Sequence, residues 1–430
     1  MENNEATEFS WSIFPDVTPN VGAAGRVWFA QPLVVAPNIL AFSGYVEHGN
    51  PDTVIRILCG GEHLIDVVAA PGFLVTLPVT AGNYYFQLWI GGECIHLWEI
   101  RRAKISDSKG LPADLEHKSQ SQLEPFALHG SLGQLFLGGD SNDSIGQFTE
   151  DRELDDSSIA GWNYVFKSLK FWKSNFDIDN ISVLIAPAKE EIFKEYYPYE
   201  RARRSVLDHF MLEFRDFEVV FPKWDLLSKR YFSYSSTDTH WTDYGATIGA
   251  SAVLRAWSYP EKGLPDSFRI IQRIGDLGSK VTPHLASYEL CFSREFKERL
   301  VFDNGISNQG NIRIFRNPDA PRSESLLIFG DSFGTNLATA FAGVFRQVTY
   351  VYQPAGFDPD LVRIIRPQNV LLQITQRFLH GQPATGKSVF SNGLNKLMAM
   401  EAGPRAAAID RMSSVPKEFI PLVAPILSAL

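Results

Sequence analysis

Residues 328–334 read IFGDSFG, an apolar run that meets Gly-Asp-Ser and continues into a stretch of helical character. A strand, a tight turn and a helix in that order indicate an α/β sheet, with the turn at the carboxyl edge where such sheets bind ligands. Gly330 permits the turn. The start of the following helix offers free N–H groups to an anion. Ser332 is therefore a candidate nucleophile, although a simple helix cap by Asp331 or Ser332 explains the motif about equally well.

A second polar motif precedes another expected helix. Residues 236–242 read STDTHWT, and the helix is expected over residues 242–257 with Thr242 as its N-cap. His240 could accept the proton of a serine hydroxyl, and Asp238 could hold the imidazole in the required tautomer. The alternative is an exposed loop histidine. No metal site is expected, because no second His or Cys lies at ligand spacing.

The residues around these motifs alternate between strand and helix patterns. This alternation predicts a parallel sheet with helices on both faces, a three-layer α/β domain. A less regular segment, residues 258–322, is expected to be an insertion, and the apolar residues 419–430 a docking helix or tail. Strands are expected at residues 135–139, 181–186, 217–221, 325–329, 348–352 and 370–374, and helices at 158–176, 189–197, 242–257 and 333–345.

The N-terminal part has a different pattern. Short segments rich in β-branched and aromatic residues fill residues 25–102, separated by turn signals such as the hairpin pair Gly91-Gly92. We expect a small antiparallel β-sandwich over residues 1–102, a linker over 103–125 and the α/β domain over 126–430. Aromatic side chains of the sandwich offer either a platform for stacking sugars or ordinary core. They are Trp28, Tyr84, Tyr85, Trp89 and Trp98.

Length and composition exclude several classes of protein. The 430 residues suggest two or three domains, and 45% hydrophobic residues exclude a mainly disordered chain. The formal net charge is 40 − 49 = −9, so no nucleic-acid partner is expected. Cys59, Cys94 and Cys291 are too few for a disulfide scaffold. We expect no membrane span, because no apolar run is long enough, and a cytoplasmic location, because no signal peptide is visible.

The two motifs together resemble a known group. Residues 238–242, DTHWT, followed by Gly245, and residues 330–333, GDSF, resemble the signature of the SGNH-hydrolase-like domain of alginate O-acetyltransferases, the AlgX/AlgJ-like group. Residues 133–140, GQLFLGGD, resemble that group's opening strand. IAPAK at 185–189 resembles its Pro-x-Lys segment, and residues 369–379 its terminal strand. The likeness covers roughly residues 126–382. The Asp/His block precedes the Gly-Asp-Ser block, a permuted order that this group shares.

The resemblance implies acyl transfer to polysaccharide hydroxyls through a Ser-His-Asp triad. Ser332 would be the nucleophile, His240 the general base and Asp238 the residue that orients it. The Ser332 backbone N–H would be the first oxyanion donor, with Gly330 in the same turn. The group's members are exported, so the resemblance would suggest a periplasmic location.

The sequence departs from the SGNH pattern at several points. The blocks that complete the oxyanion hole have no clear match, and Gln353 is a candidate second donor. Gln376 stands in place of the usual acidic neighbour of Arg377, which binds a substrate carboxylate or pairs within the fold. Lys189 contacts substrate or is a solvated lysine at a helix start. Aromatic rings near Trp241 are candidates for sugar stacking.

The favoured function is O-acetyl transfer to a polysaccharide or oligosaccharide through an acyl-serine intermediate, with a carbohydrate acceptor, an acyl donor and no bound cofactor. A carbohydrate O-acetyl esterase would use the same triad, with water as the acceptor. A non-catalytic carbohydrate-binding protein on an SGNH scaffold is the alternative outside enzymes. The sequence leaves the sugar, the donor and the oligomeric state open.

Overall fold

The computed structural model divides the chain into two compact units, residues 1–123 and 124–430. It describes the strands between residues 9 and 104, and residues 126–430 apart from 131–133, 282–283, 382 and 386–387. Each unit is described by itself. The stacking candidates Trp28, Tyr84, Tyr85, Trp89 and Trp98 have side chains outside the described residues.

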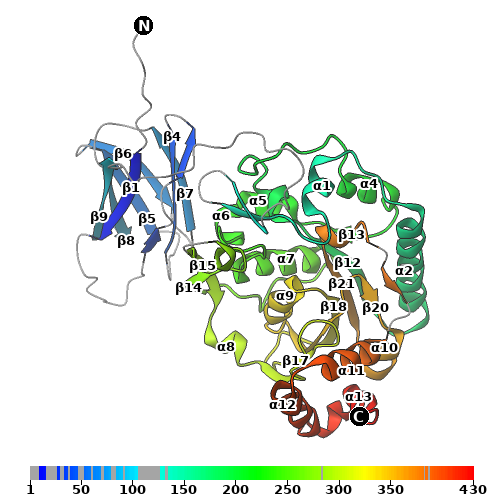
Figure 1. Cartoon of the computed structure of the whole chain (residues 1–430). Coiled ribbons are helices and arrows are strands. Elements are labelled where there is room, and N and C mark those ends of the chain that lie inside the picture. The colour runs from blue at the N-terminus through cyan, green and yellow to red at the C-terminus, as the bar shows by residue number, and fades with distance from the viewer. Residues whose placement is uncertain are drawn as a thin grey trace. The chain divides into compact units, whose positions relative to one another are not determined.

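The first unit contains two antiparallel sheets (Figure 1). One has the strand order β1-β9-β8-β5-β6, and in the other β4 pairs with β2, β3 and β7. The predicted hairpin at Gly91-Gly92 is present, because Ile90 pairs with Glu93. The strands are β1 (Phe9–Pro15), β2 (Val27–Phe29), β3 (Leu33–Ala36), β4 (Ile39–Val46), β5 (Thr53–Cys59), β6 (Glu62–Val68), β7 (Gly72–Pro78), β8 (Tyr84–Ile90) and β9 (Glu93–Lys104).

A seven-stranded, mainly parallel sheet forms the centre of the second unit (Figure 1). Its order is β13-β12-β21-β18-β19-β17-β16; the first five strands are parallel, and β17 and β16 continue antiparallel. The prediction of an α/β domain with a largely parallel sheet is confirmed. The strands are β12 (Asn180–Ala186), β13 (Val219–Val220), β16 (Leu300–Asp303), β17 (Ile312–Arg316), β18 (Arg322–Gly330), β19 (Phe345–Tyr352) and β21 (Asn369–Thr375).

Helices cover both faces of this sheet, as Figure 1 shows. Along β12, Ile181, Val183 and Ile185 pack in the core that includes the apolar face of α2 (Asp156–Asn175). Alternate residues of a strand point to opposite faces, so Ser182 lies on the other face, where its hydroxyl accepts a hydrogen bond from Trp257. On that face α7 (Asp243–Ala256) packs against α9 (Phe333–Phe341). Burial on both faces explains the continuous apolar runs of the central strands.

The remaining elements of the second unit surround these layers. The helices are α1 (Ser144–Thr149), α3 (Lys189–Ile192), α4 (Val206–Glu213), α5 (Lys223–Ser228), α6 (Arg230–Ser233), α8 (Arg294–Lys297), α10 (Pro359–Ile365), α11 (Val389–Ala399), α12 (Ala402–Ser413) and α13 (Ala424–Leu427), with 3-10 turns at Gly278–Lys280, Gln376–Phe378 and Lys417–Leu422. The short strands pair as β10 (Ala127–His129) with β11 (Leu135–Leu137), β14 (Phe268–Ile274) with β15 (Ala286–Phe292), and β20 (Gly356–Phe357) with β22 (Ala384–Thr385).

The segment 258–322 is more regular than the sequence suggested. It contains the β14–β15 hairpin, and its strands β16 and β17 extend the central sheet. In β17 the arginines Arg313 and Arg316 interrupt the apolar run, so the strand lacks the continuous pattern of its parallel neighbours. The helix expected over 333–345 is also too long. It ends at Phe341, and Phe345 already begins β19.

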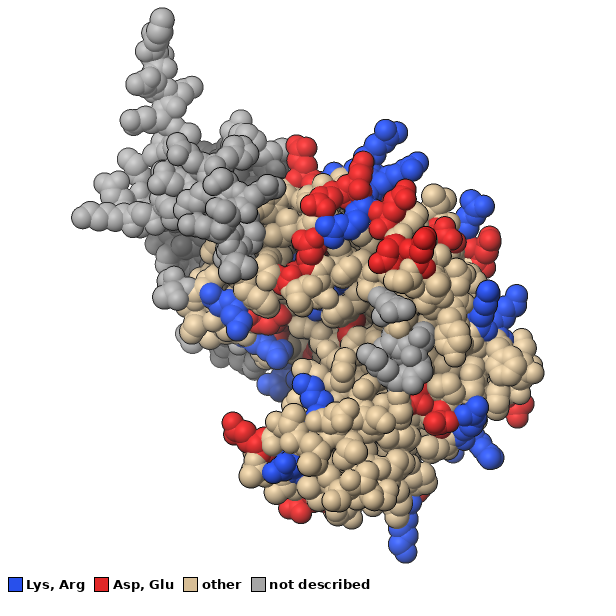
Figure 2. Space-filling view, turned by 45° about the vertical axis from the view of Figure 1, so that its right-hand side comes forward, with Lys and Arg blue, Asp and Glu red and all other residues tan. Residues whose placement is uncertain are grey.

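The C-terminal residues dock onto the second unit. Phe419, Leu422 and Ile426 are buried in the same core as β12 and α2. Within the described part of the chain, no helix is both long and apolar enough to cross a membrane. On the face seen in Figure 2, basic and acidic side chains of the second unit lie interspersed.

Candidate active site

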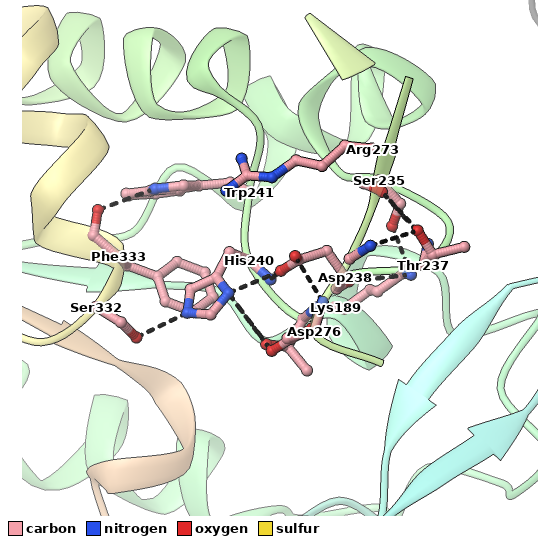
Figure 3. A network of polar contacts seen from close by, with 12 residues as sticks. Lys189, Ser235, Thr237, Asp238, His240, Trp241, Arg273, Asp276, Ser332 and Phe333 are labelled. Carbon is pink, nitrogen blue, oxygen red and sulfur yellow. Dashed lines mark hydrogen bonds and ion pairs between the residues drawn. The ribbon is translucent and has the colours of Figure 1, made fainter. Parts of the chain in front are cut away.

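Ser332 lies between the last residue of β18 and the first residue of α9. Its side chain does not cap the helix, because Asp331 Oδ1 accepts the hydrogen bond from the Phe333 backbone N–H, at 3.0 Å. The Ser332 hydroxyl is therefore available to another partner. Its Oγ lies 2.8 Å from His240 Nε2 (Figure 3).

The carboxylate of Asp331 anchors the turn that carries Ser332. This side chain is fully buried, and its Oδ2 accepts a 2.6 Å hydrogen bond from the backbone N–H of Thr375, at the end of β21. The Gln373 amide donates to Asp331 Oδ1 and accepts from the Asp331 backbone N–H. The turn is thus fastened to the neighbouring strand, which fixes the position of Ser332.

Gly330 is required for close approach in this turn. A Cβ at this position would lie 2.6 Å from Gln373 Oε1, the atom that accepts from the Asp331 backbone N–H. Any side chain here would displace the buried glutamine. The residue predicted as part of the oxyanion site therefore makes room for the hydrogen-bond network behind Ser332.

Asp238 and His240 lie on the loop before α7, and their side chains meet as the sequence predicted. Asp238 Oδ1 lies 2.7 Å from His240 Nδ1 and also accepts the His240 backbone N–H at 2.8 Å (Figure 3). Burial acts to raise the pKa of Asp238, but the hydrogen bonds and charge of His240 outweigh it and hold that pKa well below its usual range. Asp238 is therefore ionised and fixes the ring with Nε2 toward Ser332.

A second carboxylate, Asp276, was missed in the sequence. It follows β14, and its Oδ2 lies 3.6 Å from His240 Nδ1. It also accepts hydrogen bonds from the backbone N–H and the hydroxyl of Thr239. Asp276 belongs to the segment expected to be an irregular insertion, and no motif marks it. Only the β14–β15 hairpin brings it to the site.

Lys189 was expected either to contact substrate or to be solvated, and both expectations are wrong. The residue is 3% exposed. Its ammonium group donates to the carbonyls of Leu135, Ser235 and Ser236 at 2.6–2.9 Å, and to that of Asp238 at 3.3 Å (Figure 3). Lys189 thus ties the loop that carries Asp238 to β11. Burial lowers its pKa to about 7, against the opposing attraction of Asp238 and Asp276.

We expect Lys189→Met to change how stability depends on pH. An unfolded lysine keeps its proton up to about pH 10.4, whereas folded Lys189 releases it near pH 7. Between these values the unfolded chain binds more protons, so the free energy of unfolding of the wild type rises with pH. This slope should be smaller in Lys189→Met. Urea unfolding of both proteins across this pH range measures it, with the exposed Lys194→Met as the control. Equal slopes would contradict the titration assigned to Lys189.

Trp241 is part of the core and not a stacking surface. It is 2% exposed, and its indole N–H donates to the Phe333 carbonyl at 3.1 Å. Its ring packs edge-on against the Phe333 ring, with centroids 5.3 Å apart. The His240 ring lies 4.9 Å from the same phenylalanine. Trp241 therefore joins the histidine loop to the start of α9, which sets the distance between His240 and Ser332.

Arg377 lies beside Phe333, the residue that follows Ser332. Its guanidinium lies over the Phe333 ring, 5.6 Å from the centroid, and it forms no ion pair with any residue that the structure describes. Tyr352, which the sequence did not single out, is at the end of β19. Burial raises the pKa of Tyr352, partly offset by the charge of Arg377 and a polar interaction with Ser332. Tyr352 thus borders Ser332, whereas Arg377 lies over the ring of the following residue, Phe333.

The side chain of Gln353 is buried, although its backbone adjoins the nucleophile turn. Its N–H donates to the Gly330 carbonyl at 2.8 Å, and its Oε1 accepts from Asn392 at 3.2 Å. Gln376 is likewise buried and accepts the backbone N–H of Ala188. These contacts describe structural glutamines, so Gln353 gains no support as the second oxyanion donor.

Asp238, His240 and Asp276 have ligand atoms within 4.8 Å of one another, a spacing that a metal ion could use. Among the described residues, however, each of these groups already has a partner. His240 Nδ1 is bonded to Asp238, Asp238 Oδ2 accepts from the Asp276 backbone, and Asp276 accepts from Thr239. Hydrogen bonds therefore account for the cluster.

No family model matches the chain, and no curated protein matches it. Among solved structures, it is similar to PatB1 of Bacillus cereus, with 11% identity, a TM-score of 0.46, and coverage of 60% of this chain and 98% of that one. It is also similar to a DHHW family protein of Eubacterium siraeum, with 14% identity, a TM-score of 0.41, and coverage of 60% and 96%.

The O-acetyltransferase domain of Pseudomonas putida AlgJ is a third similar structure. It has 16% identity, a TM-score of 0.37, and coverage of 66% of this chain and 99% of that domain. AlgJ belongs to the group that the sequence motifs resemble. These likenesses are distant.

Proposed function

We propose that this protein is an O-acetyltransferase that transfers an acetyl group to a sugar hydroxyl through an acyl-Ser332 intermediate. The observation that carries the proposal is the continuous chain Ser332–His240–Asp238, with contacts of 2.8 Å and 2.7 Å. A serine bonded to a histidine, itself oriented by a buried carboxylate, is the arrangement that activates a serine nucleophile. The acetyl group and the sugar acceptor come from the resemblance of the two sequence motifs.

In the first half-reaction, Ser332 Oγ attacks the acetyl carbonyl of the donor while His240 Nε2 takes the serine proton. The donor's oxygen leaves with that proton, and the acetyl group remains as an ester on Ser332. Asp238 stays ionised and stabilises the imidazolium formed between the two steps. In the second half-reaction, His240 takes the proton of a sugar hydroxyl, whose oxygen attacks the acyl-serine. Ser332 Oγ then leaves and recovers the proton.

The Ser332 backbone N–H is the proposed first oxyanion donor. No residue that the structure describes accepts a hydrogen bond from it, whereas the N–H groups of Phe333 and Gly334 are both taken by Asp331. It lies at the start of α9, where the helix dipole favours negative charge. Arg377, half-buried beside Phe333, is a proposed contact for an anionic group of the substrate.

Two further features of the chain, the order of its motifs and its first unit, are part of the proposal. The order of the blocks, Asp238 and His240 before Ser332, is proposed as a permuted SGNH arrangement. The two antiparallel sheets of the first unit are proposed as a β-sandwich that binds carbohydrate. Of the linker expected over residues 103–125, Ala103 and Lys104 belong to β9, and residues 105–125 lie outside the described residues. Neither feature is needed for the chemistry at Ser332.

The partition of the acyl-enzyme between sugar and water tests the transfer step. With p-nitrophenyl acetate as donor and an oligosaccharide as acceptor, we expect acetylated oligosaccharide to form faster than free acetate. Mass spectrometry of the oligosaccharide and an acetate assay measure the two products, with Ser332→Ala as the blank. Free acetate alone, over a range of sugars, would identify an esterase. If neither acetylated oligosaccharide nor free acetate forms in a Ser332-dependent way, the binding-protein alternative is favoured.

A further inference from the structure

Two carboxylates, and not one, face the Nδ1 side of His240. Asp238 Oδ1 lies at 2.7 Å and Asp276 Oδ2 at 3.6 Å from this nitrogen. Figure 3 shows the two aspartates on the same side of the ring, opposite Ser332. The mechanism above uses only Asp238, so the second carboxylate has no assigned role.

Asp276 also orients the hydroxyl of Thr239. This hydroxyl donates to Asp276 Oδ2 at 2.5 Å, and its oxygen lies 3.3 Å from His240 Nδ1. Because its proton points to Asp276, the lone pairs of Thr239 Oγ1 are free to face the ring nitrogen. Asp276 therefore acts on His240 Nδ1 in two ways: directly through its negative charge, and indirectly by orienting Thr239 Oγ1 as a hydrogen-bond acceptor.

The backbone holds Asp276 firmly in this position. Its N–H donates to Asp238 Oδ2 at 3.0 Å, and the N–H groups of Leu277 and Gly278 both donate to the Thr237 carbonyl. A Cβ at Gly275 would lie 2.1 Å from that carbonyl, so only glycine fits there. The turn after β14 is thus clamped against the loop that carries His240. The Asp276 carboxylate is therefore held at a fixed distance from the His240 ring.

We propose that Asp276 is a second positioning residue for His240, which stabilises the imidazolium together with Asp238 and orients Thr239. The inference rests on the proposed function, because it concerns the same general base. A negative charge near the ring favours the protonated form, and the effect is moderated because the Asp276 side chain is 38% exposed. Asp276 acts through His240 and does not contact the reacting atoms.

Other charged groups around the ring are part of the same balance. Lys189 acts electrostatically on both aspartates from behind the loop, and Arg273 of β14 acts on Asp238. On the opposite side, Arg377 lies over the Phe333 ring, which packs against His240. The hydroxyls of Ser332 and Tyr352 complete the surroundings. Without the negative charge of Asp276, less negative charge near the His240 ring balances the positive charges of Lys189, Arg273 and Arg377.

The test is Asp276→Asn, which keeps the size and an acceptor oxygen but removes the charge. We expect the acid limb of the kcat/KM profile for p-nitrophenyl acetate to move to lower pH, because a ring with less negative surroundings loses its proton more easily. The plateau should fall by up to about tenfold. Thr239→Val should lower the plateau while the charge of Asp276 remains, and the exposed Asp266→Asn is the matched control.

A merely structural Asp276 predicts a different result. The plateau would then fall with the acid limb unmoved, and that outcome overturns the proposal. NMR titration of the His240 ring measures the same shift independently of catalysis. It compares Ser332→Ala with the double variant Ser332→Ala/Asp276→Asn. If Ser332→Ala still hydrolyses the ester, the proposed function fails, while the ring titration still decides the role of Asp276.

Discussion

Ser332→Ala should abolish the release of acetate from p-nitrophenyl acetate by this protein. Loss of a triad serine lowers kcat by about 10⁴- to 10⁶-fold in serine hydrolases. The same change should abolish formation of acetylated oligosaccharide, because no acyl-enzyme can form. Steady-state hydrolysis measures the rate, and mass spectrometry of the denatured protein shows whether an acetyl group is attached at residue 332. Activity near that of the wild type would remove Ser332 from the proposed mechanism.

The fold should survive this change. The Ser332 side chain does not cap α9, and the anchoring contacts of the turn belong to Asp331. Alanine removes one hydroxyl and leaves these contacts intact, so the melting temperature should stay close to that of the wild type. Ser325→Ala is a matched control, because Ser325 lies in β18, the strand that leads to Ser332, and bonds to Gln368 away from the site. It should retain activity.

Asp331→Ala should have the largest effect on stability. Its carboxylate is fully buried and accepts hydrogen bonds from the backbone N–H groups of Phe333 and Thr375 and from the Gln373 amide. Alanine leaves three buried donors without an acceptor. A buried donor left without an acceptor typically costs about 1–3 kcal/mol of unfolding free energy. Activity should fall as well, because the turn that carries Ser332 loses its attachment to β21.

Chemical denaturation of the second unit, residues 124–430, measures this loss if that unit is soluble alone; otherwise the whole chain is followed through its tryptophans. The exposed Asp319→Ala is the control and should change stability by less than about 0.5 kcal/mol. Asp331→Asn provides a milder variant that retains one acceptor oxygen. If Asp331→Ala unfolds at the same denaturant concentration as the wild type, the hydrogen-bond network is not what holds the turn.

The parallel strands were predictable from sequence because burial on both faces leaves a strong signature. β12 and β21 are apolar runs without alternation, and both lie at the centre of the sheet. Strands β16 and β17 were missed, because β16 is only four residues long and partly exposed and arginines interrupt the apolar residues of β17. Their place in the sheet depends on the pairing of β17 with β19 and of β16 with β17, which no local pattern encodes.

The same contrast holds for the candidate site. Ser332, His240 and Asp238 stand in short motifs that made them candidates, and the resemblance of the two motifs together to the alginate group implied their roles. Lys189 was misread because a lysine in sequence looks solvated, whereas here four carbonyls surround its ammonium group. Trp241 was misread because its aromatic ring suits either stacking or core, and only the packing of α7 against α9 decides between them.

The sequence by itself determined the class of the second unit and the three residues proposed to react, because strand burial and short polar motifs are local properties. Tertiary structure alone decided which groups support them. Asp276 reaches His240 through a hairpin, and Gln373 holds Asp331 from a neighbouring strand. Lys189 fastens the histidine loop from the start of α3. These partners are far apart in the chain, so only the folded arrangement of the sheet and its loops brings their charges and hydrogen bonds together.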